Sequence, residues 1–219
     1  MSQTKIKIYI VEDHPLLIQG ISTLINQQTD MEVCGNSSTI NDAYTGISAQ
    51  KPGAVILDIS LKNNENGLNL LKKLKVEYPD LPVLVLSMYD EPIYVERSLQ
   101  MGAMGYVTKK EAAAVIINAI HKILKREIFL NPDVATKLIG KLYNTSPEPS
   151  ALSVELLTNR ELEIFEMIGK GLATKDIASS LGLKISTVET HRTHIKDKLQ
   201  IQNNNELIRV AVQWSMNAT

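Results

Sequence analysis

The sequence predicts an α/β fold, a doubly wound parallel sheet of five strands, followed by a small all-α domain. Apolar and β-branched segments alternate with segments of helical spacing over residues 5–125. Residues 144–150 contain two prolines and no large apolar residue, which is typical of a linker. From residue 157 onward only helical patterns recur.

The elements of the first domain follow in order along the chain. The predicted strands are residues 6–11, 31–35, 55–58, 83–87 and 105–108. The predicted helices are residues 15–28, 39–50, 68–74, 92–101 and 111–125. The strands at 55–58 and 83–87 are almost wholly apolar, as expected for strands buried on both faces of a parallel sheet. Right-handed crossovers then place helices on both faces.

Composition limits the possible functions. The 219 residues carry a formal net charge of -1, so the chain as a whole has no strong attraction to nucleic acid or membranes. One cysteine, Cys34, cannot form a disulfide within the chain, which suits a reducing cytoplasm. There is no cleavage-like leader and no apolar run long enough to span a membrane, so we expect a cytoplasmic protein without membrane contact.

Polar side chains follow the ends of four predicted strands: Glu12 and Asp13, then Asp58, Ser87 and Lys109. The carboxyl ends of parallel strands meet at one edge of the sheet, where ligands bind. Three neighbouring carboxylates repel one another unless a cation lies among them, and oxygen ligands favour Mg²⁺ or Mn²⁺. The pattern therefore predicts transfer of a phosphoryl group to an ionised carboxylate. Singly, each residue could instead cap a helix, end a strand or lie in a loop.

With this set, residues 5–125 resemble the receiver domain of bacterial response regulators, which has a flavodoxin-like fold. The resemblance implies that Asp58 accepts a phosphoryl group from a sensor histidine kinase. It also implies a metal site formed by Asp13, Asp58 and the backbone carbonyl of Ser60, with Glu12 acting through water.

The same resemblance assigns Ser87 as the switch hydroxyl, Lys109 as the phosphoryl-binding lysine and Tyr106 as an aromatic that turns inward. Tyr106 could also be an ordinary half-buried strand residue. Receivers usually have Pro four residues after the acceptor and Gly eight after it. Here Lys62 and Asn66 occupy those places and Gly67 comes one step late, so we expect one extra residue in this loop.

The second domain contains a predicted helix-turn-helix. Thr158 and Glu161 form a capping-box pattern at its first helix, and Gly182 separates two further helices. We expect Ser186 to cap the helix that follows, with Glu189 as its box partner. Small polar and basic side chains on this helix could contact bases and phosphates. The candidate DNA contacts are Lys184, Thr187, Glu189, Thr190, Arg192, Thr193 and Lys196.

This segment resembles the LuxR-type DNA-binding domain, and the whole chain resembles a NarL/FixJ-type response regulator. The implied organisation is a receiver at 1–128, a linker with a helical start at 129–152 and a DNA-binding domain at 153–219. The implied partners are a histidine kinase, double-stranded promoter DNA and a second copy of the chain, recruited on phosphorylation. The last helix would offer a dimer surface formed by Leu207, Ile208, Ala211 and Val212.

Two other functions remain open, and both would change what Asp58 does. A phosphatase with an aspartate nucleophile needs a second acid two residues after it, where this chain has Ser60. A LuxR-type regulator could instead carry a receiver that is never phosphorylated. Apart from the receiver's own phosphorylation chemistry, we expect no enzyme. His191 and His194 lack a cysteine or carboxylate at metal-ligand spacing in the sequence, so we expect them at solvent or phosphate rather than at zinc.

Overall fold

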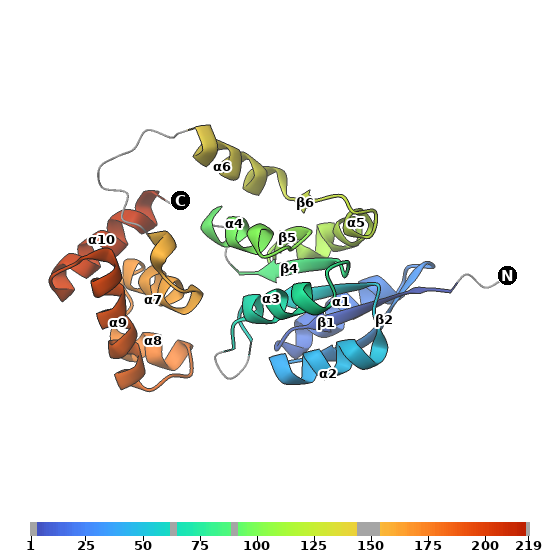
Figure 1. The fold of residues 1–219 in the computed structure, drawn as a ribbon, viewed down its shortest axis with the longest axis horizontal. Helices are drawn as coiled ribbons and strands as arrows, with labels where there is room; N and C mark the ends of the chain where they lie inside the picture. Colours follow the sequence, from blue (N-terminus) through green and yellow to red (C-terminus); the bar gives the residue numbers. More distant parts are fainter. Residues whose placement is uncertain (1–3, 62–64, 89–91, 144–153, 218–219) are drawn as a thin grey trace. The chain divides into compact units, whose positions relative to one another are not determined.

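The chain forms two units, residues 1–143 and 144–219, in a computed structural model (Figure 1). The structure describes residues 4–61, 65–88, 92–143 and 154–217. Across these residues no helix is long and apolar enough to cross a membrane.

The first unit is built on a sheet of parallel strands in the order β2-β1-β3-β4-β5-β6. The strands are β1 (Ile6–Val11), β2 (Met31–Ser37), β3 (Ala54–Asp58), β4 (Val83–Ser87), β5 (Gly105–Thr108) and β6 (Phe129–Leu130). The helices are α1 (Pro15–Asn26), α2 (Ile40–Gln50), α3 (Gly67–Glu77), α4 (Pro92–Gln100), α5 (Ala112–Leu124) and α6 (Pro132–Tyr143). The predicted doubly wound α/β fold is confirmed.

Helices lie on both faces of the sheet (Figure 1). On one face, α1 and α5 pack on the central strands through a core that includes Ile21, Ile116 and Ile120. Helices α2, α3 and α4 contact the strands from the other face. Every residue of β3 and β4 is buried, as their apolar sequences predict.

A sixth strand extends the sheet beyond the five that were predicted. Phe129 pairs with Gly105 and Leu130 with Tyr106, in parallel. The following helix, α6, contacts α4, so residues 129–143 belong to the first unit. The sequence alone predicts that this segment belongs to the linker, because a strand of two residues is too short to show an alternation of apolar and polar side chains.

In the described part of the second unit, a 3₁₀ turn (Val154–Leu156) precedes four helices. These are α7 (Asn159–Gly169), α8 (Thr174–Ser180), α9 (Ile185–Leu199) and α10 (Asn204–Asn217). The core holds Leu162 and Phe165 from α7, Val188 and Ile195 from α9, and Leu207 from α10. Its interior is therefore shared by helices distant in sequence.

The first helix of this unit has the predicted cap, whereas α9 does not. Thr158 and Glu161 form a complete capping box at α7. The prediction that Ser186 caps α9 is wrong, because α9 begins at Ile185 and Lys184 holds the cap position without a side-chain bond. Gly182 has φ +61°, a conformation that glycine adopts without strain, and it ends the turn after α8.

Gly67 fixes the start of α3 against the end of β3. A Cβ atom there would lie 1.9 Å from the carbonyl oxygen of Asp58. The Gly67 amide also donates to the carbonyl of Ile59 at 2.7 Å. Glycine, one position later than in receivers generally, thus permits the backbone to approach the candidate acceptor closely.

We expect Gly67→Ala to destabilise the protein by about 1–3 kcal/mol, because the methyl group overlaps a backbone atom that cannot move cheaply. Gly20→Ala in α1 is the control, since nothing lies within 4 Å of its added Cβ; it should stabilise the helix by roughly 0.5–1 kcal/mol. Urea denaturation followed by circular dichroism measures both. Equal stability of the two variants would contradict this account of Gly67.

Candidate functional site

Lys109 joins two buried carboxylates at the carboxyl edge of the sheet. Its Nζ lies 2.7 Å from Oε2 of Glu12, just after β1, and donates to Oδ2 of Asp58, at the end of β3, at 2.8 Å. Glu12 and Asp58 are 0% and 1% exposed. The ends of β1 and β3 therefore meet at this edge, as predicted. The ammonium group of Lys109 balances part of the charge of the two carboxylates.

The corner after β1 brings Asp13 and His14 to the same place. Oε1 of Glu12 accepts from the backbone amides of Asp13 and His14, each at 2.9 Å. Nδ1 of His14 lies 2.7 Å from that oxygen and 2.8 Å from Oδ1 of Asp13. The sequence predicts His14 only as a possible cap for α1. It does occupy the cap position, but without a side-chain capping bond.

Burial and charge move the pKa values of the three central groups in different directions. Burial, with the neighbouring Glu12 charge, raises the pKa of Asp58 to about 7, and Lys109 opposes this only in part. Burial also acts to raise the pKa of Glu12, but its bonds to Lys109 and His14 outweigh burial and lower it. Burial acts to lower the pKa of Lys109, and the two carboxylates raise it. The cluster therefore carries excess negative charge that favours a further cation.

The donor set fits a divalent cation. One ligand atom from each of Glu12, Asp13, His14 and Asp58 lies within 4.8 Å of the others. Oδ1 of Asp13 is buried and accepts no hydrogen bond from the described residues. Carboxylate oxygens are the ligands that Mg²⁺ prefers, and one or two of them suffice. Glu12, Asp13 and Asp58 all lie close enough to take part, and the assignment of Asp13 and Asp58 as the direct ligands stays a prediction.

Ser60 and the loop after β3 lie against the candidate acceptor. The backbone amide of Ser60 donates to Oδ1 of Asp58 at 3.1 Å. Ser60 also forms an antiparallel bridge with Asn66, whose side chain caps α3 through the amide of Leu68. Both ends of the loop are therefore fixed, while residues 62–64, where the extra residue was expected, lie outside the described part. The carbonyl of Ser60 as a metal ligand stays a prediction.

Ser87 and Tyr106 are both fully buried on neighbouring strands. The carbonyl of Ser87 accepts the backbone amide of Lys109 at 2.7 Å, which connects the end of β4 to the lysine. Tyr106 pairs with Val85 and lies inside the unit rather than half-buried. Both strands end at the edge that carries Lys109, and the switch role of the two residues stays a prediction.

The helix-turn-helix is formed by α8 and α9. On α9, Thr190 and Thr193 are exposed, and their hydroxyls donate to backbone carbonyls of the preceding turn. Lys184 is exposed, whereas Thr187 and Lys196 are half-buried. These five side chains still have surface that could meet DNA.

Arg192 and Glu189 have a different position from the one the sequence suggested. Arg192 is 7% exposed, and its Nη1 donates to Oγ1 of Thr174 at 3.1 Å. The same hydroxyl donates to Oε1 of Glu189 at 2.9 Å. Arg192 thus connects α9 to α8 inside the domain. The helical period placed it at the margin of the exposed side, and only the contact with Thr174 shows the direction of the side chain.

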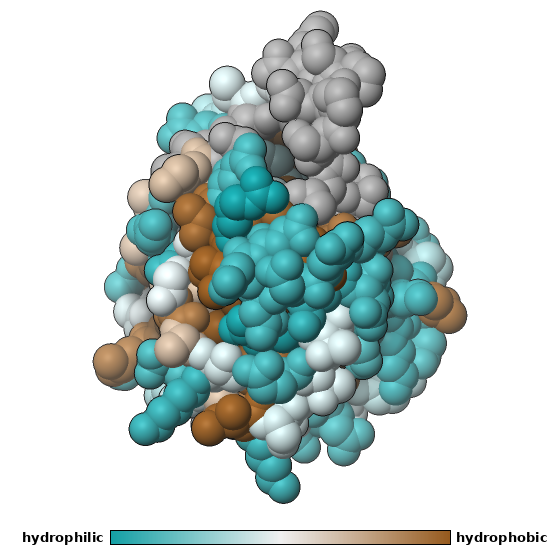
Figure 2. Space-filling view, turned by 90° about the vertical axis from the view of Figure 1, so that its left-hand side faces the viewer, coloured by the Kyte–Doolittle hydropathy of each residue, from teal (hydrophilic) through white to brown (hydrophobic). Residues whose placement is uncertain are grey.

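The four candidate dimer residues divide between the core and the surface. Leu207 and Ala211 are fully buried, and Ala211 lies at the close approach of α10 to Gly169 of α7. Ile208 is exposed, and Val212 is half-buried. Figure 2 shows the side of the second unit on which α9 and α10 lie in Figure 1, and hydrophobic patches interrupt a mainly hydrophilic surface there. Only Ile208 and Val212 therefore offer area to a partner.

Two family models match the chain. The response regulator receiver domain matches residues 8–121, and the LuxR family of bacterial regulatory proteins matches residues 155–211. Each match falls within one unit of the structure. The residues gathered around Lys109 lie in the first match, and the helix-turn-helix lies in the second.

Curated relatives extend over nearly the whole chain. The oxygen regulatory protein NreC of Staphylococcus carnosus is 32% identical over 210 residues, which is 94% of this chain and 97% of that protein. NreC of Staphylococcus epidermidis is 34% identical over 211 residues, with the same shares. The structure of the RcsB response regulator of Salmonella typhimurium is 22% identical, has a TM-score of 0.59 and covers 97% of this chain and 100% of its own. That of response regulator ChrA is 26% identical, with a TM-score of 0.52 over 96% and 98%.

The raised pKa of Asp58 has a measurable effect on stability. Between the ordinary value of 3.8 and the folded value of about 7, the folded state holds more protons than the unfolded state. The stability contributed by this group therefore falls as pH rises through that window. Asp58→Asn removes the charge at nearly constant volume. Without divalent cations, this variant should exceed the wild type above pH 7 by roughly 1 kcal/mol or more.

Urea denaturation in the presence of a chelator at several pH values tests this expectation. The difference between Asp58→Asn and wild type should shrink steadily as the pH is lowered through the window. Asp80→Asn is the control, since the Asp80 side chain is 97% exposed, and it should change stability little at any pH. A wild type as stable as Asp58→Asn at pH 8 would contradict the role of buried charge at this site.

Proposed function

Because the chain belongs to the response regulators that join a receiver domain to a LuxR-type DNA-binding domain, we propose that phosphorylation of Asp58 controls its binding to promoter DNA. It is a transcription regulator. The observation that carries the proposal is the buried cluster of Glu12, Asp58 and Lys109 at the sheet edge, in which the lysine lies 51 and 97 positions from the two carboxylates.

The chemistry needs a balanced charge rather than a general base. A carboxylate oxygen of Asp58 would bond the phosphorus of a phosphohistidine or of a small acyl phosphate while the bond from phosphorus to the donor breaks, which releases the histidine ring or the carboxylate. Lys109 would hold a phosphoryl oxygen, and the Ser60 amide keeps the acceptor carboxylate oriented. A divalent cation bound by Asp13 and Asp58 would offset charge on the transferred group. Ser87, on the adjoining strand, would donate a hydrogen bond from its hydroxyl to the phosphoryl group.

DNA recognition would use the exposed side of α9. Thr190 and Thr193 are short polar residues that suit base edges in a major groove, and Lys184 and Lys196 suit phosphates. The fixed Thr174–Glu189–Arg192 bonds would set the angle between α8 and α9 rather than contact bases. Glu189 keeps part of its exposed area and could still accept a bond from cytosine.

We further propose that phosphorylation promotes a homodimer in the cytoplasm, so that two half-sites are read together. Ile208 and Val212 on α10 would contribute to the contact between two DNA-binding domains. The solved structures similar to this chain include one described as an RcsB–DNA complex and one described as two RcsB dimers bound to two parallel DNAs.

A regulator with a receiver that is never phosphorylated is the second candidate. The loop after Asp58, with Lys62 and Asn66 in place of the usual Pro and Gly, is the observation that favours it. A regulator of this second kind would gain no mass when it is incubated with a phosphoryl donor. An aspartate-nucleophile phosphatase would instead release phosphate steadily from a small phosphoester.

We expect incubation with acetyl phosphate and Mg²⁺ to add one phosphoryl group to the wild type and none to Asp58→Ala, because the accepting oxygen is gone. Intact-mass spectrometry measures the addition. Ser60→Ala is the matched control and should still be labelled, since Ser60 contacts Asp58 through its backbone amide. Labelling of Asp58→Ala would refute the acceptor, and an unlabelled wild type would favour the second candidate.

We expect Thr190→Ala or Thr193→Ala to change the preferred DNA sequence, while Lys196→Ala weakens binding to all sequences alike. Base contacts carry sequence choice, whereas a lost phosphate contact lowers affinity and reduces the salt slope by about 1. Selection from a random DNA pool, followed by titration of cognate and scrambled duplexes at several salt concentrations, distinguishes the two effects. Equal losses on cognate and scrambled DNA for both threonine variants would contradict the proposed recognition surface.

A further inference from the structure

Two histidines on α9 and one glutamate on α7 meet in the second unit. His191 and His194 are one helical turn apart, so their side chains lie on the same side of α9. Their rings are edge-on, with centroids 6.5 Å apart. Glu161 comes from the capping box of α7, 30 residues before His191 in the sequence. One ligand atom of each residue lies within 4.8 Å of the other two.

The two oxygens of Glu161 have different surroundings. Oε2 accepts from the backbone amide of Thr158 at 2.7 Å and from Nζ of Lys198 at 2.6 Å. Oε1 faces Nδ1 of His194, 3.9 Å away. The bonds that hold the capping box and the lysine therefore leave Oε1 directed at the histidines. The carboxylate is also 4% exposed, so it is fixed in this direction.

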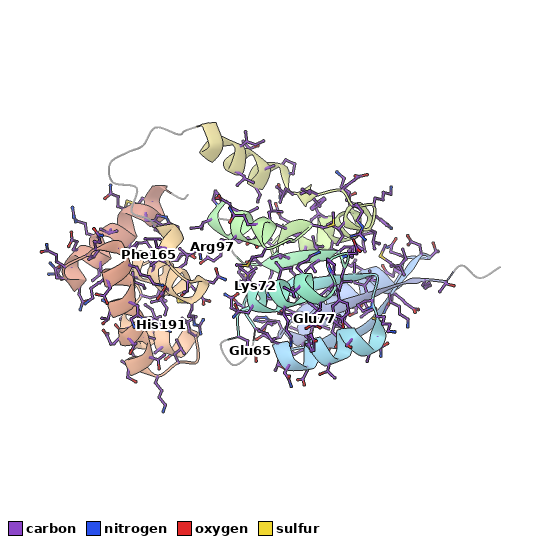
Figure 3. The ribbon with its side chains drawn as sticks, in the orientation of Figure 1. Glu65, Lys72, Glu77, Arg97, Phe165 and His191 are labelled. Atoms are coloured by element: carbon purple, nitrogen blue, oxygen red, sulfur yellow. The ribbon has the colours of Figure 1, made fainter. Side chains whose placement is uncertain are left out.

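His191 provides an independent sign of a ligand. Its Nδ1 is buried and has no hydrogen-bond partner within the described part of the chain. A buried polar nitrogen without a partner costs free energy, which a bound ion would recover. His191 is labelled in Figure 3, in the second unit.

We propose that Glu161, His191 and His194 form a binding site for a divalent transition-metal ion of the Zn²⁺ type. Two imidazole nitrogens and one carboxylate oxygen are a donor set that Zn²⁺ takes, with a fourth position left for water. Mg²⁺ prefers oxygen ligands alone and does not suit it. From the sequence alone these histidines are expected at solvent or phosphate, because no carboxylate lies at metal-ligand spacing in the chain. The third ligand comes from another helix.

Binding requires only a small movement. Four ligands at about 2.0–2.2 Å from a tetrahedral ion lie roughly 3.4 Å from one another. The His194 side chain is 54% exposed and can rotate to close the remaining distance to Glu161. The ion would then connect α9 directly to α7, and α9 is the helix that carries Thr190 and Thr193. Occupancy of the site would accordingly stabilise the second unit in one position of its recognition helix.

Calorimetric titration of the tag-free, full-length protein with Zn²⁺ tests the site. Saturating Mg²⁺ is added to compete for the acidic cluster of the first unit, the other group of possible metal ligands. We expect one Zn²⁺ per chain in the wild type and at least about tenfold weaker binding in His194→Ala, since even a lost outer-sphere partner costs that much. His121→Ala is the matched control because it removes a histidine from α5 of the first unit, where it contacts Asp30. It should bind as the wild type does.

A second readout reports on the site itself. Trp214 is the only tryptophan and packs on Phe165 of α7, with ring centroids 5.7 Å apart, so its fluorescence follows unfolding of the second unit. Zn²⁺ should raise the Trp214-monitored melting temperature of the wild type and of His121→Ala, but not of His194→Ala. Equal Zn²⁺ affinity in wild type and His194→Ala, or no Zn²⁺ binding by the wild type in Mg²⁺, would overturn the proposal.

Discussion

The ion pair between Lys109 and the two carboxylates at the sheet edge is the constraint on which the first unit depends. Glu12 and Asp58 are shielded from water, so each charge depends on the lysine for compensation. Removing the ammonium group would leave two buried carboxylates facing each other, and either alone would be costly. The contact also ties the ends of β1 and β3 to the loop after β5. It therefore organises the sheet edge and prepares the chemistry proposed there.

The same contact bears on the proposed phosphoryl transfer, because it balances only part of the negative charge at this edge. Three carboxylates lie in a cluster with one ammonium group, so a divalent cation is favoured. The raised pKa of Asp58 indicates that its charge is under-compensated by protein groups alone. Adding charge to this residue must change its balance with Lys109, whose backbone amide bonds the carbonyl of Ser87. A change at the Asp58 side chain would thus reach the end of β4 through Lys109. The side chain of Lys109 contacts Asp58, and its backbone amide contacts Ser87.

Sequence patterns predicted the sheet and the meeting of its strand ends because both follow from general rules. Continuous apolar strands require burial on both faces, and parallel strands bring their carboxyl ends to one edge. β6 was not predicted because a two-residue strand depends on the pairing of Gly105 with Phe129, which has no local signal. The contacts of His14 with Glu12 and Asp13 likewise depend on the shape of the corner after β1. Such contacts arise from tertiary structure and cannot be read from spacing.

The recognition helix shows the same limit more sharply, because helical period fixes a side of the helix but not the reach of a long side chain. Arg192 has five donors and a flexible stem, and it turns to Thr174 on α8 instead of to solvent. Glu161 likewise has a contact that spacing does not show. It completes the cap of α7, and its side chain also faces the histidines of α9. Long polar residues therefore hold the helices of the second unit together. Short residues such as Thr190 and Thr193 remain exposed because they cannot reach a second helix, and this leaves them available for contact outside the domain.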